Sequence, residues 1–136
     1  MTTPPIINEA EDFIRRQADA MVRPRESECL CCYVLRMLDE FSCDGTHRHA
    51  MRYRDVMAPR ASALDQRLRG MGACCCDCEM FLNAYGPSTM FMQRALERAF
   101  ADANGSRGQA ALPPCPGVRR GSTQPCRNWA RIRRWR

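Results

Sequence analysis

Apolar residues recur at three- and four-residue spacings along the first hundred positions, which predicts a mainly helical protein. The first such stripe lies between Asn8 and Val22 and comprises Ala10, Phe13, Ile14, Ala18, Met21 and Val22. Asn8 is a credible N-cap for this helix, and Pro24 forces its end. A second helix follows Ser27, its expected N-cap, with a stripe of Leu30, Val34, Met37, Leu38 and Phe41.

Four further segments continue the helical pattern. Residues 47–57 and 61–71 form two moderately amphipathic stretches that are separated by a proline and closed by glycines. Residues 77–85 contain a short apolar run for which a strand is the alternative, and we favour a helix capped by Asp77. The clearest amphipathic pattern covers residues 91–103 and ends at Asn104 and Gly105.

The composition changes beyond residue 105, where Gly, Pro, Ser, Gln and Arg dominate and aliphatic residues are few. Such a segment buries too little apolar surface to offset the entropy of ordering, so we expect residues 105–136 to be mostly disordered. Only residues 127–136 are expected to gain structure by docking on a partner. The predicted organisation is an N-terminal helix and linker (1–25), a cysteine-containing helical domain (26–104) and an Arg-rich tail (105–136).

The positive charge is concentrated in this tail. Residues 105–136 contain eight arginines and no acidic residue, whereas residues 1–104 carry 13 arginines against 15 acidic residues. Arginines alternating with aromatic residues can pair with phosphates and stack on bases, whereas a solvated tail without a partner is the plainer interpretation. The candidate nucleic-acid-binding residues are Arg127, Trp129, Arg131, Arg133, Arg134, Trp135 and Arg136. Another protein is the alternative partner for the same basic tail.

The chain shows neither a secretory signal nor an apolar stretch that could span a bilayer, so we expect a cytoplasmic protein without a transmembrane segment. Cytoplasmic thiols stay reduced, and clustered cysteines there indicate metal or redox chemistry more often than disulfides.

Seven of the ten cysteines lie in two short segments, residues 29–32 and 74–78. Cys29 and Cys32 lie on one face of the first turn of a predicted helix, and Cys76 and Cys78 form a tighter pair before another. A helix N-terminus favours thiolate over thiol, and Zn²⁺ usually draws its four thiolates from two such pairs. The sequence therefore predicts one structural zinc site made of these four cysteines.

Other uses of the cysteines stay open. Cys43 and His47 are substitute ligands, whereas Cys31, Cys74 and Cys75 are spares by position. An iron–sulfur cluster would accept the same four thiolates. The rival from another class is a thiol redox protein or sensor with a reactive cysteine in the 29–32 or 74–78 segment, and buried cysteines without chemistry are the third interpretation.

No motif of a known catalytic site occurs in the sequence. Glu28 and Glu79 each neighbour a cysteine pair, but a carboxylate at a helix start most simply complements the helix dipole. We therefore assign no catalytic residues and favour a protein that is not an enzyme.

The order of several segments resembles the bacterial domain-of-unknown-function family 2695 over about residues 26–85. The segments that carry the resemblance are Glu28-Cys29-Leu30-x-Cys32-Tyr33, Met37-Leu38-x-Glu40-Phe41-x-Cys43-Asp44-Gly45-Thr46, Arg52-Tyr53-Arg54-Asp55, Ala58-Pro59-Arg60-Ala61 and Cys76-Asp77-Cys78-Glu79-x-Phe81-x-Asn83. The resemblance adds weight to Cys29, Cys32, Cys76 and Cys78 as the meaningful cysteines, and it implies no enzyme class.

The sequence as a whole predicts a small, mainly α domain of four to six short helices, cross-linked by a metal site and followed by a disordered basic tail. The expected function is that of a small zinc-binding protein without enzymatic activity, associated with nucleic acid or with a protein partner.

Overall fold

The structure is a computed structural model that describes residues 5–101 and 113–133. In chain order its elements are α1 (Pro5–Val22), α2 (Leu30–Phe41), α3 (Arg48–Met57), α4 (Leu64–Gly70), the π-helix η1 (Met80–Ala84), β1 (Tyr85–Pro87), α5 (Thr89–Ala101) and β2 (Trp129–Arg131). The prediction of a mainly α protein built from short helices is confirmed. The short apolar run after Asp77 is helical, as favoured, and it leads directly into β1.

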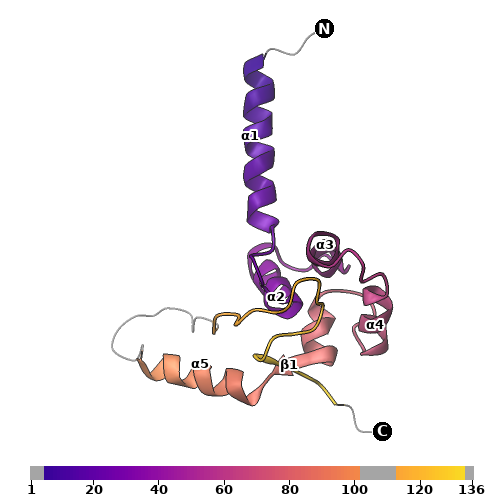
Figure 1. The fold of residues 1–136 in the computed structure, drawn as a ribbon, viewed down its shortest axis with the longest axis vertical. Coiled ribbons are helices and arrows are strands. Elements are labelled where there is room, and N and C mark those ends of the chain that lie inside the picture. The colour runs from indigo at the N-terminus through magenta and orange to yellow at the C-terminus, as the bar shows by residue number, and fades with distance from the viewer. Residues whose placement is uncertain (1–4, 102–112, 134–136) are drawn as a thin grey trace.

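Helix α1 projects from the rest of the molecule, as Figure 1 shows. Its side chains from Asn8 to Met21 are exposed, and the helix begins at Pro5 instead of Asn8. Proline is well tolerated in the first turn because the amides there have no partner within the helix. At the other end, the Tyr33 hydroxyl donates to the Val22 carbonyl and ties α1 to the body. No helix within residues 5–101 and 113–133 is both long enough and apolar enough to cross a membrane.

The core lies where α2, α3, α4 and η1 meet. The stripe predicted for the second helix points into it, and the ring centroids of Tyr33 from α2 and Tyr53 from α3 are 5.6 Å apart. The largest fully buried apolar side chains are Tyr33, Tyr53, Leu30, Met37, Leu64, Leu68, Met80 and Val34. This small core is extended by contributions from the C-terminal segment, Cys126 and Trp129.

The N-terminus of α2 is capped by Cys29, so the prediction that Ser27 caps this helix is wrong. Ser27 has a φ of 62° and lies before the helix. The Cys29 sulfur accepts a hydrogen bond from the Cys32 amide at 3.3 Å, which satisfies one free donor of the first turn. The cap thus places the sulfur of Cys29 at the helix start, beside that of Cys32.

Asp77 caps α3, not the helical segment that follows it in the chain. Its buried carboxylate accepts the amides of His49 at 2.9 Å and Ala50 at 3.1 Å. The residue that starts α3, His47, makes no side-chain capping bond of its own, and the distant aspartate supplies the missing acceptor. The Asp77 amide also donates to the Thr46 carbonyl at 3.1 Å. The 76–78 loop is therefore held against the start of α3.

The prediction that residues 105–136 are disordered fails for residues 113–133. This segment ends in β2, which pairs antiparallel with β1 through Tyr85–Arg131, Gly86–Ala130 and Pro87–Trp129. Trp129 packs between two rings of the domain, with centroid distances of 5.1 Å to Phe81 and 5.3 Å to Phe91. A count of aliphatic residues misses this segment because an aromatic ring and two cysteines anchor it. The rest of the predicted tail, residues 105–112 and 134–136, lies outside the described residues.

We predict that Asp77→Ala lowers the free energy of unfolding by about 3 kcal/mol, because it leaves two buried amides without an acceptor. Urea unfolding followed by circular dichroism measures the change. The matched control is Asp55→Ala on the surface of α3, for which a change within about 0.5 kcal/mol is expected. Equal stabilities of the two variants would show that the Asp77 bonds do not support the fold.

Candidate metal centre

Four cysteine sulfurs from distant parts of the chain converge beside the start of α2. The sulfurs of Cys29, Cys32, Cys115 and Cys126 all lie within 4.8 Å of one another. The first two belong to the cap and first turn of α2, and the other two come from the C-terminal segment that crosses α2 in Figure 1. The Cys32 and Cys126 sulfurs are 3.7 Å apart.

Each of the four sulfurs accepts an N–H donor. The Cys29 amide donates to Cys115 at 3.4 Å, and the Cys32 amide donates to Cys29 at 3.3 Å. The indole Nε1 of Trp129 donates to Cys32 at 3.3 Å, and the backbone of Asn128 supplies a hydrogen bond to Cys126. Such bonds favour the thiolate over the thiol, because they stabilise the charged form of each sulfur.

The protons of the cluster are shared unequally. Hydrogen bonds from Cys29 and Cys32 lower the pKa of Cys126 to about 4, despite its burial. The same contacts raise the pKa of Cys29 and of Cys32, which are the donors. The metal-free cluster therefore holds one thiolate surrounded by thiols, and a bound cation would replace the protons of those thiols.

The geometry of the four cysteines fits a tetrahedral thiolate centre. Four bonds of about 2.3 Å in tetrahedral directions place the sulfurs about 3.8 Å apart. The observed Cys32–Cys126 distance of 3.7 Å agrees, and the other sulfurs lie close enough to reach one ion with small side-chain adjustments. Cys29 and Cys126 are buried, and the centre offers four soft donors with no carboxylate or imidazole among them.

The structure brings Cys29 and Cys32 together as predicted but does not add Cys76 and Cys78 to them. Those two lie instead beside Cys43, whose side chain hydrogen-bonds to both. The sequence argument treated residues 105–136 as disordered and so left Cys115 and Cys126 out of the search for ligands.

A local signal for the missed pair exists around Cys115. Cys115-Pro116-Gly117 forms a turn in which Gly117 has a φ of 96°, a conformation that side chains disfavour. A Cβ on Gly117 would lie 3.3 Å from the Ser27 Cβ, and the Val118 amide donates to the Ser27 carbonyl at 2.9 Å. A cysteine followed by a tight turn that lies against the residues before Cys29 is therefore the pattern that could have identified the site.

His47, a predicted substitute ligand, has a structural position. It is buried, its Nε2 is 2.8 Å from the Ala73 carbonyl oxygen, and its Nδ1 is 3.6 Å from an Asp77 carboxylate oxygen. Within the described residues it does not join either group of closely spaced candidate ligands. Its contacts connect the start of α3 to the segment that precedes Cys74.

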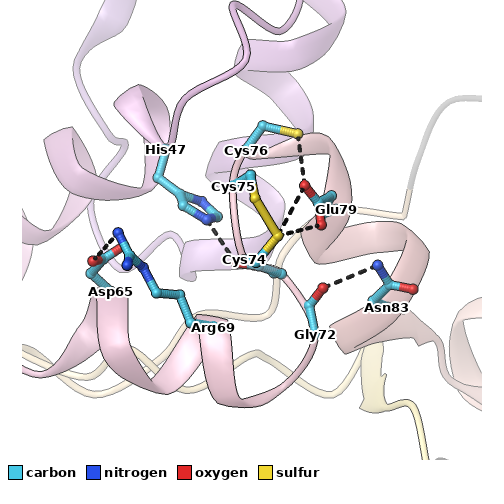
Figure 2. Close-up of a disulfide and its surroundings, with 10 residues drawn as sticks. His47, Asp65, Arg69, Gly72, Cys74, Cys75, Cys76, Glu79 and Asn83 are labelled. Atoms are coloured by element: carbon cyan, nitrogen blue, oxygen red, sulfur yellow. Dashed lines mark hydrogen bonds and ion pairs between the residues drawn. A yellow bond between two sulfur atoms is a disulfide. The ribbon is translucent and has the colours of Figure 1, made fainter.

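The predicted spare cysteines have other surroundings. Cys31 is fully buried in the core, and this burial raises the pKa of its thiol. Cys74 and Cys75 are exposed and joined by a disulfide, and the Cys74 sulfur lies 3.4 Å from a Glu79 carboxylate oxygen (Figure 2). The remaining cysteines are free thiols.

Glu28, the other acidic neighbour of a cysteine pair, supports the turn before α2. Its carboxylate accepts the Arg25 amide at 3.0 Å and pairs with the Arg36 guanidinium at 2.7 Å. Both carboxylate oxygens of Glu28 are thus engaged within the fold.

The candidate nucleic-acid-binding residues separate into two groups. Trp129 is buried between Phe81 and Phe91, so its ring faces are not free to stack on bases. Arg127, Arg131 and Arg133 are exposed. The other three, Arg134, Trp135 and Arg136, lie outside the described residues.

Comparison with known proteins assigns the central segment. Residues 30–83 match the family described as protein of unknown function (DUF2695). The resemblance expected from the sequence is confirmed over this segment. The matched segment contains Cys32 and Cys43, together with the cysteines of residues 74–78, whereas Cys29, Cys115 and Cys126 lie outside it. No curated protein and no solved structure was found that is similar to this chain.

We predict that Trp129→Ala lowers the free energy of unfolding by about 3 to 5 kcal/mol, because it removes the ring between Phe81 and Phe91. Denaturant titration of the full chain measures the loss. The control is Leu82→Ala, whose side chain is 71% exposed and whose removal should change stability by less than about 1 kcal/mol. A Trp129→Ala variant as stable as the control would mean that the C-terminal segment does not pack on the domain.

Proposed function

We propose that Cys29, Cys32, Cys115 and Cys126 bind one Zn²⁺ ion whose role is structural. The observation that carries this proposal is the set of four sulfurs within 4.8 Å of one another. The N–H donor to each sulfur supports it further. Four thiolates leave no coordination position for water or substrate, and closed sites of this kind stabilise folds instead of catalysing reactions.

The proposed ion solves a folding problem of the C-terminal segment. Residues 113–128 contain no helix or strand, and few of their side chains are buried. Two cysteines of this segment bonded to the same ion as the cap of α2 would fix it at two points, Cys115 and Cys126. Metal binding to such a site contributes directly to the free energy of folding, because the unfolded chain offers no preformed site.

Zinc is the metal that fits the donor set best. It takes four thiolates in a tetrahedral arrangement without a redox change, whereas an iron–sulfur cluster needs space for inorganic sulfide and iron between the cysteines. Sulfurs as close as 3.7 Å suit a single ion. The free thiols of the other cysteines suit a reducing compartment, and we therefore assign the protein to the cytoplasm.

The metal-bound module presents arginines to a partner in this proposal. The exposed arginines of the C-terminal segment are Arg119, Arg120, Arg127, Arg131 and Arg133. Their segment lies against the domain, so the charges are carried by a placed surface, which lowers the entropy cost of binding. A polyanion such as nucleic acid is the partner whose charge matches this surface.

A thiol redox role is the second candidate, and the Cys74–Cys75 disulfide is the observation that favours it. The two sulfurs are exposed and can react with a dissolved peroxide or disulfide, which would take up the two electrons that the thiols lose. Cys29 and Cys32 do not fit this role, because Cys29 is buried and both sulfurs are engaged in the four-cysteine cluster.

We predict that Cys126→Ser loses one equivalent of zinc per chain and that its thermal stability no longer depends on a chelator. Metal analysis after purification, with a count of reactive thiols, measures the first effect, and melting curves with and without chelator measure the second. When free metal exceeds its dissociation constant a thousandfold, the stabilisation lost is about 4 kcal/mol.

The control for this experiment is the double variant Cys74→Ser, Cys75→Ser, which removes two exposed sulfurs and should keep the zinc. A wild-type protein without metal, in which the thiols of the four-cysteine cluster react freely, would contradict the structural zinc site.

We also predict that the triple variant Arg119→Gln, Arg120→Gln, Arg127→Gln weakens binding to labelled DNA or RNA. The logarithm of affinity should depend less steeply on the logarithm of salt, by about 0.9 per lost phosphate contact on a duplex. Replacing Arg15 and Arg16 of α1 with Gln is the matched control, because these arginines are exposed but lie outside the C-terminal segment. Equal loss in both variants, or no binding by the wild-type chain at low salt, would remove this surface from the account.

A further inference from the structure

A second group of cysteines lies apart from the four-cysteine cluster. Cys43 follows the end of α2, and Cys76 and Cys78 precede η1. The Cys43 side chain is hydrogen-bonded to those of both Cys76 and Cys78, so it lies between them. All three are partly exposed free thiols, and the four-cysteine centre uses none of them.

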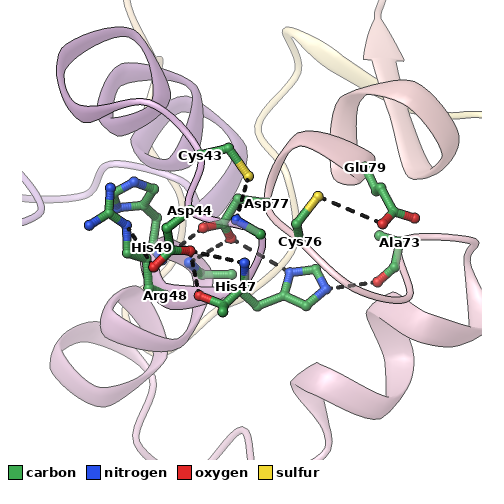
Figure 3. A network of polar contacts seen from close by, with 12 residues as sticks. Cys43, Asp44, His47, Arg48, His49, Ala73, Cys76, Asp77 and Glu79 are labelled. Atoms are coloured by element: carbon green, nitrogen blue, oxygen red, sulfur yellow. Dashed lines mark hydrogen bonds and ion pairs between the residues drawn. The ribbon is translucent and has the colours of Figure 1, made fainter.

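Asp77 holds the two segments of this group together. The aspartate lies between Cys76 and Cys78 in the chain, and its carboxylate caps α3, which starts five residues after Cys43. Figure 3 shows the Asp77 carboxylate directed at the start of α3, with Cys43 and Cys76 on the two segments that it joins. The buried aspartate therefore fixes the backbone positions from which the three sulfurs project.

The sulfurs of this group also receive backbone donors. The Gly45 amide donates to the Cys43 sulfur at 3.4 Å, and the Cys78 backbone gives it another hydrogen bond. The Glu79 backbone supplies one to Cys76. Amides directed at thiolates favour binding of a cation, as they do in the four-cysteine centre.

Glu79 adds a carboxylate to the group. Its Oε1 lies 3.6 Å from the Cys76 sulfur, and its Oε2 lies 3.4 Å from that of Cys74. Cys74 is joined to Cys75 and has no thiolate to offer, so Glu79 is the remaining anionic donor beside Cys76 (Figure 2). Zn²⁺ accepts a carboxylate oxygen at about 2.0 to 2.2 Å beside thiolates at about 2.3 Å.

We propose that Cys43, Cys76, Cys78 and Glu79 form a second binding site for a thiophilic divalent cation such as Zn²⁺. The three sulfurs are grouped more loosely than the first four and do not all lie within 4.8 Å of one another. Cys43 already contacts both others, and rotation of the partly exposed Cys76 and Cys78 side chains about χ1 brings them onto one ion.

The two centres differ in access to solvent. Cys29 and Cys126 of the first centre are buried, whereas all four ligands of the second are partly exposed. A partly exposed ion with one carboxylate ligand exchanges with solvent more readily than a buried one with four thiolates. The second site should therefore bind zinc more weakly and lose it first to a chelator.

Native mass spectrometry of the full chain, purified under reducing conditions with zinc, tests this proposal. The wild-type protein should carry two zinc ions, and Cys43→Ser and Cys78→Ser should each carry one. The control is the double variant Cys74→Ser, Cys75→Ser, which should keep both. Glu79→Gln should keep two ions but release one of them at about a tenfold lower chelator concentration, as expected for weakening of a single ligand.

The outcomes separate the two centres. One zinc in the wild type that Cys43→Ser retains would overturn the second site and leave the first intact. One zinc that Cys43→Ser loses and Cys126→Ser keeps would support the second site and overturn the first. No zinc in any form would overturn both.

A second measurement on the wild-type chain avoids variants that fail to fold. Cadmium-113 NMR of the cadmium-substituted protein should show two resonances, one from a site with four sulfurs and one from a site with three sulfurs and an oxygen. A single resonance at one equivalent of cadmium per chain, unchanged by further cadmium, would overturn the second site.

Discussion

The meeting of four sulfurs at the start of α2 is the contact on which the arrangement of the chain depends. Cys29 and Cys126 are nearly a hundred residues apart, and their loops are closed around one point. Closing loops of this length costs several kcal/mol of chain entropy, and hydrogen bonds between thiols return little of it. A thiophilic ion supplies the missing free energy, because four metal–thiolate bonds form only in the folded chain.

Asp77 performs a similar joining role inside the DUF2695 segment. A carboxylate that caps a helix from another part of the chain satisfies two buried amides and fixes the relative position of two loops. The aspartate sits between two cysteines, so the bond that caps α3 also positions Cys76 and Cys78 beside Cys43. The same short segment therefore supports the fold and assembles the second group of sulfurs.

The helices could be predicted from the sequence because their apolar stripes follow the helical period closely. The caps could not be predicted, since the acceptor at the start of α3 comes from Asp77, which lies far along the chain, and Cys29 takes the place of Ser27. The order in residues 113–133 was also hidden, because Trp129 finds its place between Phe81 and Phe91 only in the folded chain. The cysteine pairs were recognised by spacing, but spacing says nothing of which pairs share one ion.

Anomalous diffraction from crystals of the purified full chain at the zinc absorption edge tests the central claim most directly. The account predicts a peak about 2.3 Å from the sulfurs of Cys29, Cys32, Cys115 and Cys126, at the centre of the tetrahedron that they form. A map without a peak at this point, with Cys32 and Cys126 instead joined by a disulfide, would contradict it.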